Sequence, residues 1–292
     1  MGTNTIKALV LASLFAACKA PSGDLAPEER AKREAALAQA RSEFEADPTS
    51  EEKIIWLGRR TAYLEDYEGA IEIYTRGIAL HPESYRLLRH RGHRYITTRR
   101  FDLAVEDLRR AAALIEGVPN AVEPDGQPNP ANVPTSTTHT SVFYHLGLAH
   151  YLRGEFDAAR EAYRSCLAFT ENDDMLCAAS HWLYMTLRRL GREEDARAVL
   201  QPIRPEMTIH ENGDYHRLLL MYKGLLRPED LLGGGEDAVG KATVGYGVGN
   251  WFLYNGDAER ARRVFESLLE GTNPAAFGRI AAEVDLARMR GR

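Results

Sequence analysis

A group of small and bulky residues recurs at a fixed interval in the first half of the chain. Five residues are followed, 34 positions later, by five of matching character: Gly58, Tyr67, Ala70, Tyr74 and Gly77, then Gly92, Phe101, Ala104, Leu108 and Ala111. An interval of this length is the signature of helix–turn–helix units that stack side by side. We expect the glycines to mark close approach of two helices and the bulky residues to fill the contact. The spacing therefore predicts an array of helical hairpins.

The pattern returns after an interruption. A third copy follows the second by a constant 55 positions and consists of Gly147, Phe156, Ala159, Tyr163 and Cys166. Weaker fourth and fifth copies contain Leu183, Leu187, Gly191, Ala196 and Leu200, and then Gly249, Phe252, Gly256, Ala261 and Phe265. Alanine, leucine, arginine and glutamate dominate the chain and β-branched residues are scarce, which favours an all-helical fold.

The first two copies resemble the tetratricopeptide (TPR) repeat. The match lies in Leu57, Gly58, Asp66, Tyr67, Ala70, Tyr74 and Pro82. The second copy departs from the family at Arg91, where leucine is preferred, and at Glu116, which stands in place of proline. The resemblance implies an all-α, TPR-like helical-hairpin solenoid of about four to five repeats, with a spacer helix and a C-terminal capping helix.

Prolines, glycines and capping residues place the boundaries along the chain. Thr49 with Glu52 is expected to cap the first repeat helix, residues 215–226 to form the spacer helix, and Pro274 to open the last helix. The segments are a signal peptide with lipobox (1–17), a tether and N-terminal helix (18–48), TPR units 1–2 (49–118), a proline-rich linker (119–138), TPR units 3–4 (139–210), a spacer helix and glycine-rich connection (211–241), and a TPR-like unit 5 with a capping helix (242–291).

The N-terminus has the features of a targeting segment. Lys7 precedes a short apolar run, residues 8–17, which is too short to span a membrane and ends at Cys18. The end of the run resembles a bacterial lipobox, although Phe15 replaces the usual leucine; the resemblance implies that the Cys18 thiol is lipidated. Ordinary cleavage after Ala20 and a buried N-terminal helix are the alternatives. The lysine after the cysteine favours, by resemblance, an outer-membrane-anchored lipoprotein that faces the periplasm.

The order of the segments is similar to that of enterobacterial TPR lipoproteins of the new lipoprotein I type. The resemblance implies a scaffold or adaptor in the cell envelope that presents partner proteins to proteases or peptidoglycan hydrolases. Its partners would be envelope proteins or peptides, together with the membrane through the lipid anchor. The formal net charge of -5 argues against nucleic acid as a partner. A homodimer is a further alternative.

The linker, residues 119–138, interrupts the repeats with five prolines among polar residues, so no helix can run through it. A surface insertion without a role is the simpler interpretation, because long loops close at little entropic cost. The alternative is that it grips a partner.

Cys166 and Cys177 lie near facing helix ends and could pair in an oxidising envelope, although Cys166 also suits the small-residue contact that Gly77 and Ala111 fill.

The search for catalytic residues gives one alternative function. Gly235 and Lys241 have the spacing of a phosphate-binding loop, but Ala242 replaces the required hydroxyl and no strand precedes them. His90 and His93 lie one helical turn apart without an obvious third ligand. The alternative is therefore a nucleotide- or metal-dependent enzyme that uses Lys241 or a histidine cluster. We expect no enzyme activity, catalytic residue, metal or cofactor.

The TPR resemblance also implies a binding surface, because the first helix of each unit lines a concave groove. Counted from the repeat glycines, the groove positions are basic and aromatic, which suits an extended or helical peptide with acidic groups. The lysine and asparagine of the family's carboxylate clamp are absent, so a free C-terminal carboxylate is not expected. The expected groove residues are Arg59, Tyr63, Arg86, Arg89, His93, Tyr144, Tyr151, His181 and Arg188.

Overall fold

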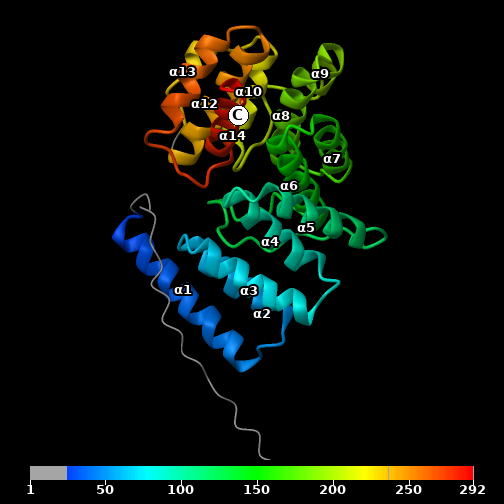
Figure 1. Ribbon diagram of the computed structural model, residues 1–292, viewed down its shortest axis with the longest axis vertical. Helices are drawn as coiled ribbons and strands as arrows, with labels where there is room; N and C mark the ends of the chain where they lie inside the picture. Colours follow the sequence, from blue (N-terminus) through cyan, green and yellow to red (C-terminus); the bar gives the residue numbers. More distant parts are fainter. Residues whose placement is uncertain (1–24, 236, 292) are drawn as a thin grey trace, which may run out of the picture.

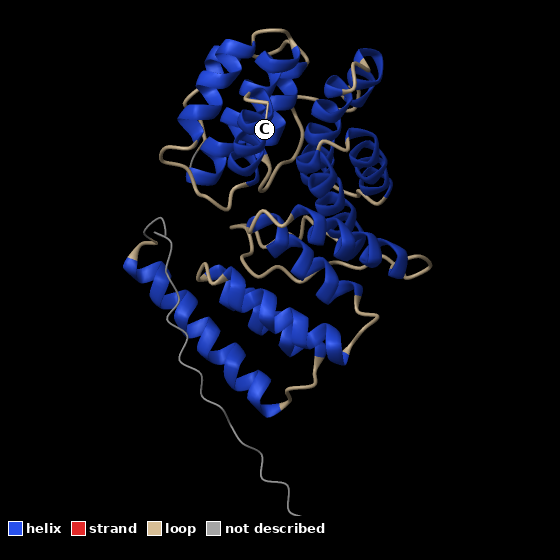
Figure 2. Cartoon of the chain, in the orientation of Figure 1, coloured by secondary structure: helices blue, strands red, loops and turns tan. Residues whose placement is uncertain are grey.

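Helices form most of the molecule that the computed structural model describes, namely residues 25–235 and 237–291 (Figure 2). These residues contain fourteen helices and no strand; their one β-bridge joins Val122 and Thr137. The predicted signal peptide and Cys18 lie outside the described residues. None of the described helices has the length and apolar character needed to cross a membrane.

Five hairpins follow one another along the chain, which confirms the predicted all-α TPR-like solenoid (Figure 1). They are preceded by α1 (Pro27–Ala46), and α10 (Gly213–Tyr222) and α11 (Pro228–Leu231) separate the last two. The hairpins pair α2 (Glu51–Tyr63) with α3 (Tyr67–Leu80), α4 (Tyr85–Thr97) with α5 (Phe101–Leu114), α6 (Thr138–Arg153) with α7 (Phe156–Ala168), α8 (Asp173–Arg189) with α9 (Glu193–Val199), and α12 (Ala238–Tyr254) with α13 (Ala258–Leu268). The chain ends in α14 (Phe277–Met289).

Each strong repeat glycine faces a bulky side chain sixteen positions later, as the spacing predicted. A β-carbon added at Gly58 would lie 2.4 Å from the Tyr74 ring, and one added at Gly147 would lie 2.7 Å from the Tyr163 ring. These separations are well below van der Waals contact, so only glycine permits this packing. The weak fourth unit has Tyr184 at the equivalent position, and its second helix, α9, is only seven residues long.

Substitution of Gly147 with alanine is expected to lower the free energy of unfolding by about 1–3 kcal/mol, because the added methyl group overlaps Tyr163. The matched control is Gly213→Ala, where a β-carbon meets nothing within 4 Å. That change should leave stability unchanged or raise it by up to about 1 kcal/mol through helix propensity. Urea unfolding of both variants tests the contact, and equal effects at the two positions would contradict it.

Some predicted helix ends are wrong. The first repeat helix is capped by Ser50, whose hydroxyl accepts from the Lys53 amide at 3.5 Å, and not by Thr49. The spacer helix α10 ends at Tyr222 rather than at residue 226, and Gly224 follows with a φ of 79°. The last helix begins at Phe277, three residues after Pro274, because Ala276 provides the N-cap position.

The last helix, α14, lies against repeats that are distant in sequence. The Phe277 ring is 5.3 Å from the His93 ring of α4 and 5.8 Å from the His145 ring of α6. Arg99, in the turn between α4 and α5, forms an ion pair with Glu283 at 2.9 Å. The array therefore curls so that its end contacts its middle, and Figure 1 shows the C-terminus close to the centre of the upper half.

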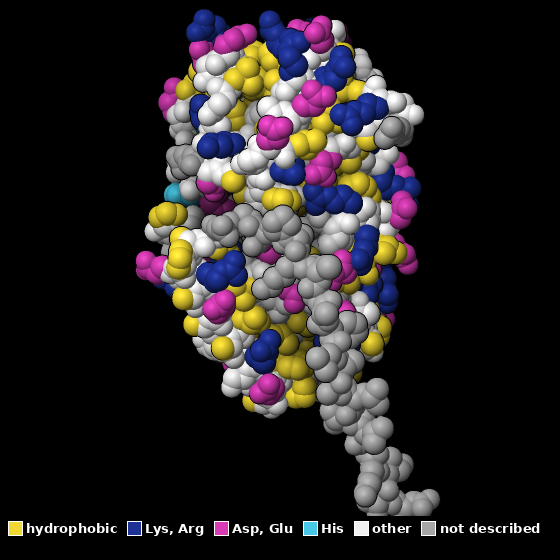
Figure 3. Space-filling model, turned by 60° about the vertical axis from the view of Figure 1, so that its left-hand side comes forward, with side chains coloured by type: hydrophobic (Ala, Val, Ile, Leu, Met, Phe, Trp, Pro, Cys, Tyr) yellow, Lys and Arg dark blue, Asp and Glu magenta, His cyan; other side chains and the backbone are white. Residues whose placement is uncertain are grey.

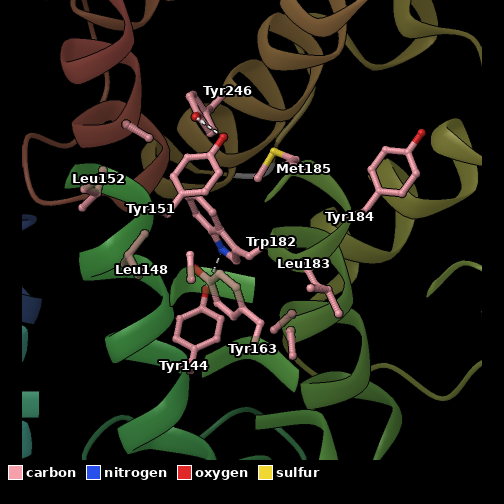
Figure 4. Packing of buried hydrophobic residues seen from close by; sticks show 14 of the residues in the cluster. Tyr144, Leu148, Tyr151, Leu152, Tyr163, Trp182, Leu183, Tyr184, Met185 and Tyr246 are labelled. Carbon is pink, nitrogen blue, oxygen red and sulfur yellow. Dashed lines mark hydrogen bonds between the residues drawn. The ribbon is translucent and has the colours of Figure 1, made fainter. Parts of the chain in front are cut away.

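Aromatic side chains form much of the core between α6, α8 and α12 (Figure 4). The Trp182 indole lies 5.2 Å from the Tyr151 ring and 5.8 Å from the Tyr246 ring. The sulfur atoms of Cys166 and Cys177 are both free and buried, and burial raises the pKa of each thiol to about 12. The two cysteines therefore pack as small apolar residues rather than as a disulfide.

Candidate functional site

A cleft of about 780 Å³ opens on the concave side of the array, between the first two repeats and the C-terminal helices. Residues of α6 and α8 line it, among them Tyr144, His145 and the apolar Met175 and Ala178. Arg59 of α2 and Arg89 of α4 line one side. Residues 209–217 and the start of α12 line the other side, together with Phe277 of α14. The first two repeats and the last helix thus meet around one opening.

The proline-rich linker covers the groove of the first two repeats; we call residues 119–137 the strap. Its Glu123 carboxylate lies 2.9 Å from Arg89 Nη2 and 3.3 Å from His90 Nε2. The strap's carbonyl groups make further contacts, since Arg59 Nη1 donates to the oxygen of Pro124 at 2.6 Å. Arg60 Nη1 donates to the oxygen of Gly126 at 2.9 Å. The strap is therefore bound as an extended acidic peptide would be.

The proton positions at Glu123 follow from the contacts of His90. Burial holds the pKa of His90 well below its usual value, so the imidazole is neutral at neutral pH. Arg89 Nη1 donates to His90 Nδ1 at 2.9 Å, which leaves the ring proton on Nε2, where it is donated to Glu123. Burial also lowers the pKa of Arg89. Glu123 is thus held by one cationic and one neutral donor.

The other end of the strap is attached to the segment after the fourth repeat. Glu211 accepts from Asn129 Nδ2 at 2.6 Å and from Thr135 Oγ1 at 2.9 Å. The loop that carries Glu211 is fixed by the buried Asp174 carboxylate, which accepts from the amides of residues 210, 211 and 212 at 2.8–2.9 Å. The strap therefore connects the first two repeats to the C-terminal half of the cleft.

Only some of the predicted groove residues lie at this site. Arg59, Arg89 and Tyr144 line the cleft. Tyr63 lies beneath the strap, where its hydroxyl accepts from Arg59 Nε at 3.2 Å. Arg86 is half-buried on the same helix as Arg89. The structure thus brings Arg59, Tyr63 and Arg89 of repeats 1 and 2 together near Tyr144.

The other predicted groove residues do not face an open groove. Tyr151 is fully buried, and its hydroxyl accepts from Asn250 Nδ2 at 2.8 Å. His181 is also buried, with Tyr215 and Tyr222 against its ring. His93 is covered by His145 and Phe277, and Arg188 donates to Asn255 Oδ1 at 2.9 Å. The prediction fails here because the curled array places α10, α12 and α14 over this face.

Several residues of the cleft were not predicted from the sequence. Glu123 and Pro124 belong to the strap. An acidic residue followed by proline, in a chain whose first repeats have an arginine-rich groove, was a sequence signal that could have indicated this contact. Tyr215 shares a hydrogen bond with Tyr144, with 3.1 Å between the hydroxyl oxygens. No repeat position marks Tyr215 or Phe277, because they come from the spacer and from the terminal helix.

The residues of the alternative, enzymatic hypothesis are also placed by the structure. Lys241 is exposed in the first turn of α12, and residues 213–235 before it form helices and turns. Within the part of the chain that the structure describes, no group of three or more His, Cys, Asp or Glu side chains is arranged to hold a metal ion. His150 pairs with Glu155 at 2.6 Å instead.

Family comparisons agree with this geometry. One tetratricopeptide-repeat model matches residues 57–119 and a second matches residues 141–168, which are the first three hairpins. These two stretches are thus TPR repeats. A comparison with curated proteins found no match.

Three solved structures with similar folds are distant in sequence. The Cut9–Hcn1 hetero-tetramer of the APC/C is 16% identical, with a TM-score of 0.50, and the match covers 88% of this chain and 40% of that one. MamA is 18% identical, with a TM-score of 0.45, and the match covers 70% of this chain and 98% of that one. YrrB, described as a TPR protein with an unusual peptide-binding site, is 13% identical at a TM-score of 0.45, with 86% and 97% covered. At 16% identity, the similarity to Cut9–Hcn1 shows the fold alone.

Proposed function

We propose that this protein is a non-enzymatic scaffold of the bacterial cell envelope that binds a polypeptide segment of a partner protein in the cleft. The observation that carries the proposal is the cleft itself, which lies on the concave face of a TPR solenoid. Its volume of about 780 Å³ falls within the range of ~300–1,000 Å³ that is usual for ligand sites. Solenoids bury their core between neighbouring repeats and leave this face for a partner.

The lining of the cleft favours a polypeptide over a small metabolite. Tyr144, Tyr215 and Phe277 offer aromatic contacts, with apolar Met175 and Ala178 beside them. Arg59 and Arg89 line one side, beside Glu123 and Asp125 of the strap, and the other side has Glu211 and Asp237 together with Arg217. An extended segment with apolar side chains and charges of both signs would match this lining.

A photo-crosslinking amino acid at Val239 tests the cleft. Val239 lines the opening and is 46% exposed, whereas Leu103 of α5 lies outside it and is 42% exposed, so Leu103 is the matched control. We expect a crosslinked envelope protein at position 239 and not at position 103. A synthetic peptide of the crosslinked segment should then bind the purified protein and lose most of its affinity on Tyr215→Ala. Equal capture at both positions would contradict the proposal.

The lipid anchor is the second part of the proposal, and it is supported by the sequence alone. Lipidation of the Cys18 thiol would hold the scaffold at the membrane, which suits partners that are themselves envelope proteins. In a Gram-negative host, we expect the unaltered protein in the membrane fraction and Cys18→Ser outside it. Mass spectrometry of the membrane form should show a diacylglycerol-modified cysteine, and an unmodified thiol would refute the anchor.

A further inference from the structure

We propose that the basic side of the cleft, formed by the first two repeats, recognises an extended acidic peptide, and that the strap is its built-in occupant. We call this surface the arginine groove; it consists of Arg59, Arg60, Arg86, Arg89 and Arg94 of α2 and α4. A partner peptide would bind there by exchanging with residues 123–126. This inference deepens the proposed function. It takes from that function only the assumption that the protein binds a partner polypeptide.

The strap uses contacts that almost any acidic peptide could reproduce. Two of the four are made by main-chain carbonyl oxygens, at Pro124 and Gly126, and the other two by one carboxylate, that of Glu123. Gly126 is the one position with a steric requirement, because a β-carbon there would lie 2.2 Å from the Tyr63 hydroxyl oxygen. The groove therefore recognises an acidic residue followed by extended backbone, with glycine three positions after it.

Apolar burial contributes little to holding the strap in place. Val122 is 58% exposed and Val133 is 40% exposed, so the strap's two valines are directed largely to solvent. The part that includes Asn129 and Thr135 is bound separately, through Glu211. Release of residues 123–126 from the arginine groove would therefore break mainly polar contacts, together with the packing of Gly126 on Tyr63, while the far end of the strap stays attached.

The arginine groove has more positive charge than the strap neutralises. Among the ion pairs of the described residues, these five arginines receive one carboxylate, that of Glu123. In addition, Arg89 Nε is buried without a hydrogen-bond partner. On the face drawn in Figure 3, by contrast, basic and acidic side chains are interspersed. A peptide with two or more carboxylates would thus satisfy the groove better than the strap does.

The test uses the purified full chain and a fluorescent, amidated peptide with the sequence of residues 120–127. In unaltered protein the tethered strap competes at a high effective concentration, so Glu123→Ala is expected to raise the peptide's affinity by roughly tenfold or more. Adding Arg89→Ala to that variant should abolish the gain, and a peptide with glutamine in place of glutamate should bind no better than background. Glu116→Ala, an equal charge change at an exposed position, is the matched control.

Several outcomes would overturn the inference. One is equal peptide affinity for the unaltered chain and Glu123→Ala, and another is binding that survives Arg89→Ala. A third is binding of the peptide only when it ends in a free carboxylate and not when it is amidated. The site would then recognise the C-terminus of a chain rather than an internal segment. Glu123→Gln, a milder change, is measured in the same way. Circular dichroism of each variant shows whether it is folded. Retention of the Val239 crosslink alongside failure of peptide binding would refute this inference and leave the proposed function standing.

Discussion

Replacing Asp285 with alanine is expected to lower the free energy of unfolding by about 3–5 kcal/mol, because it leaves a buried cation without its partner. The Asp285 carboxylate is 1% exposed and accepts from Arg189 Nη1 at 2.9 Å and Nη2 at 3.1 Å. The Tyr246 hydroxyl donates to it at 2.9 Å and Arg288 Nη1 at 3.0 Å. The substitution therefore leaves four donor atoms, on α8, α12 and α14, without the carboxylate that accepts from all of them.

The matched control is Asp195→Ala, which breaks an exposed ion pair with Arg192. Such surface pairs contribute about 0–1 kcal/mol, so its effect should be small. Replacing both Arg189 and Asp285 with apolar residues of similar size is expected to recover much of the loss, since the double variant removes the buried Arg189 cation along with its partner and leaves only the partly exposed Arg288 without a carboxylate. Urea unfolding measures all three variants. A loss for Asp285→Ala as small as that for the control would show that α14 is held by apolar packing alone.

Asp285 also illustrates what the sequence could and could not predict. The repeat interval located the helical hairpins, because the Gly58–Tyr74 and Gly147–Tyr163 contacts are made within one unit. The curl of the array depends on contacts between residues far apart in the chain, such as Arg99 with Glu283. No interval within a repeat encodes such contacts. For that reason Tyr151 and His181 were expected in an open groove and are found beneath other helices.

The strap was missed for a related reason. Prolines correctly excluded a helix there, but the same prolines leave the path of the loop undetermined. The ion pair between Glu123 and Arg89 joins two positions whose spacing follows no period. Complementary charge was the only available clue, because the groove of repeats 1 and 2 is basic and the linker contains Glu123 and Asp125. The groove residues Arg59 and Arg89 were predicted because they lie within the repeats, whereas their occupant does not.

Acidification is expected to destabilise the protein strongly through its buried histidines. Burial lowers the pKa of His145 and of His181 to about 3, whereas an unfolded histidine titrates near pH 6.5. Between these values the unfolded chain binds more protons than the folded chain, so stability falls as the pH falls. Each of these two histidines is expected to lower the free energy of unfolding by about 1.4 kcal/mol per pH unit once the pH is well below 6.5. Between pH 6.5 and 4.5 this amounts to about 2.5 kcal/mol for each histidine.

The variant His181→Phe separates this effect from the titration of carboxylates. Phenylalanine preserves a flat ring between Tyr215 and Tyr222, and it removes the group that must become charged on unfolding. Unfolding by urea at pH 7.5, 6.5, 5.5 and 4.5 should therefore show a smaller loss of stability on acidification for His181→Phe than for the unaltered protein. The exposed His210, changed to glutamine, is the control and should leave the slope as it is. The contrary outcome is that His181→Phe loses as much stability on acidification as the unaltered protein does. That result would show that His181 does not resist protonation in the folded protein, and it would contradict a water-free aromatic core between α8 and α10.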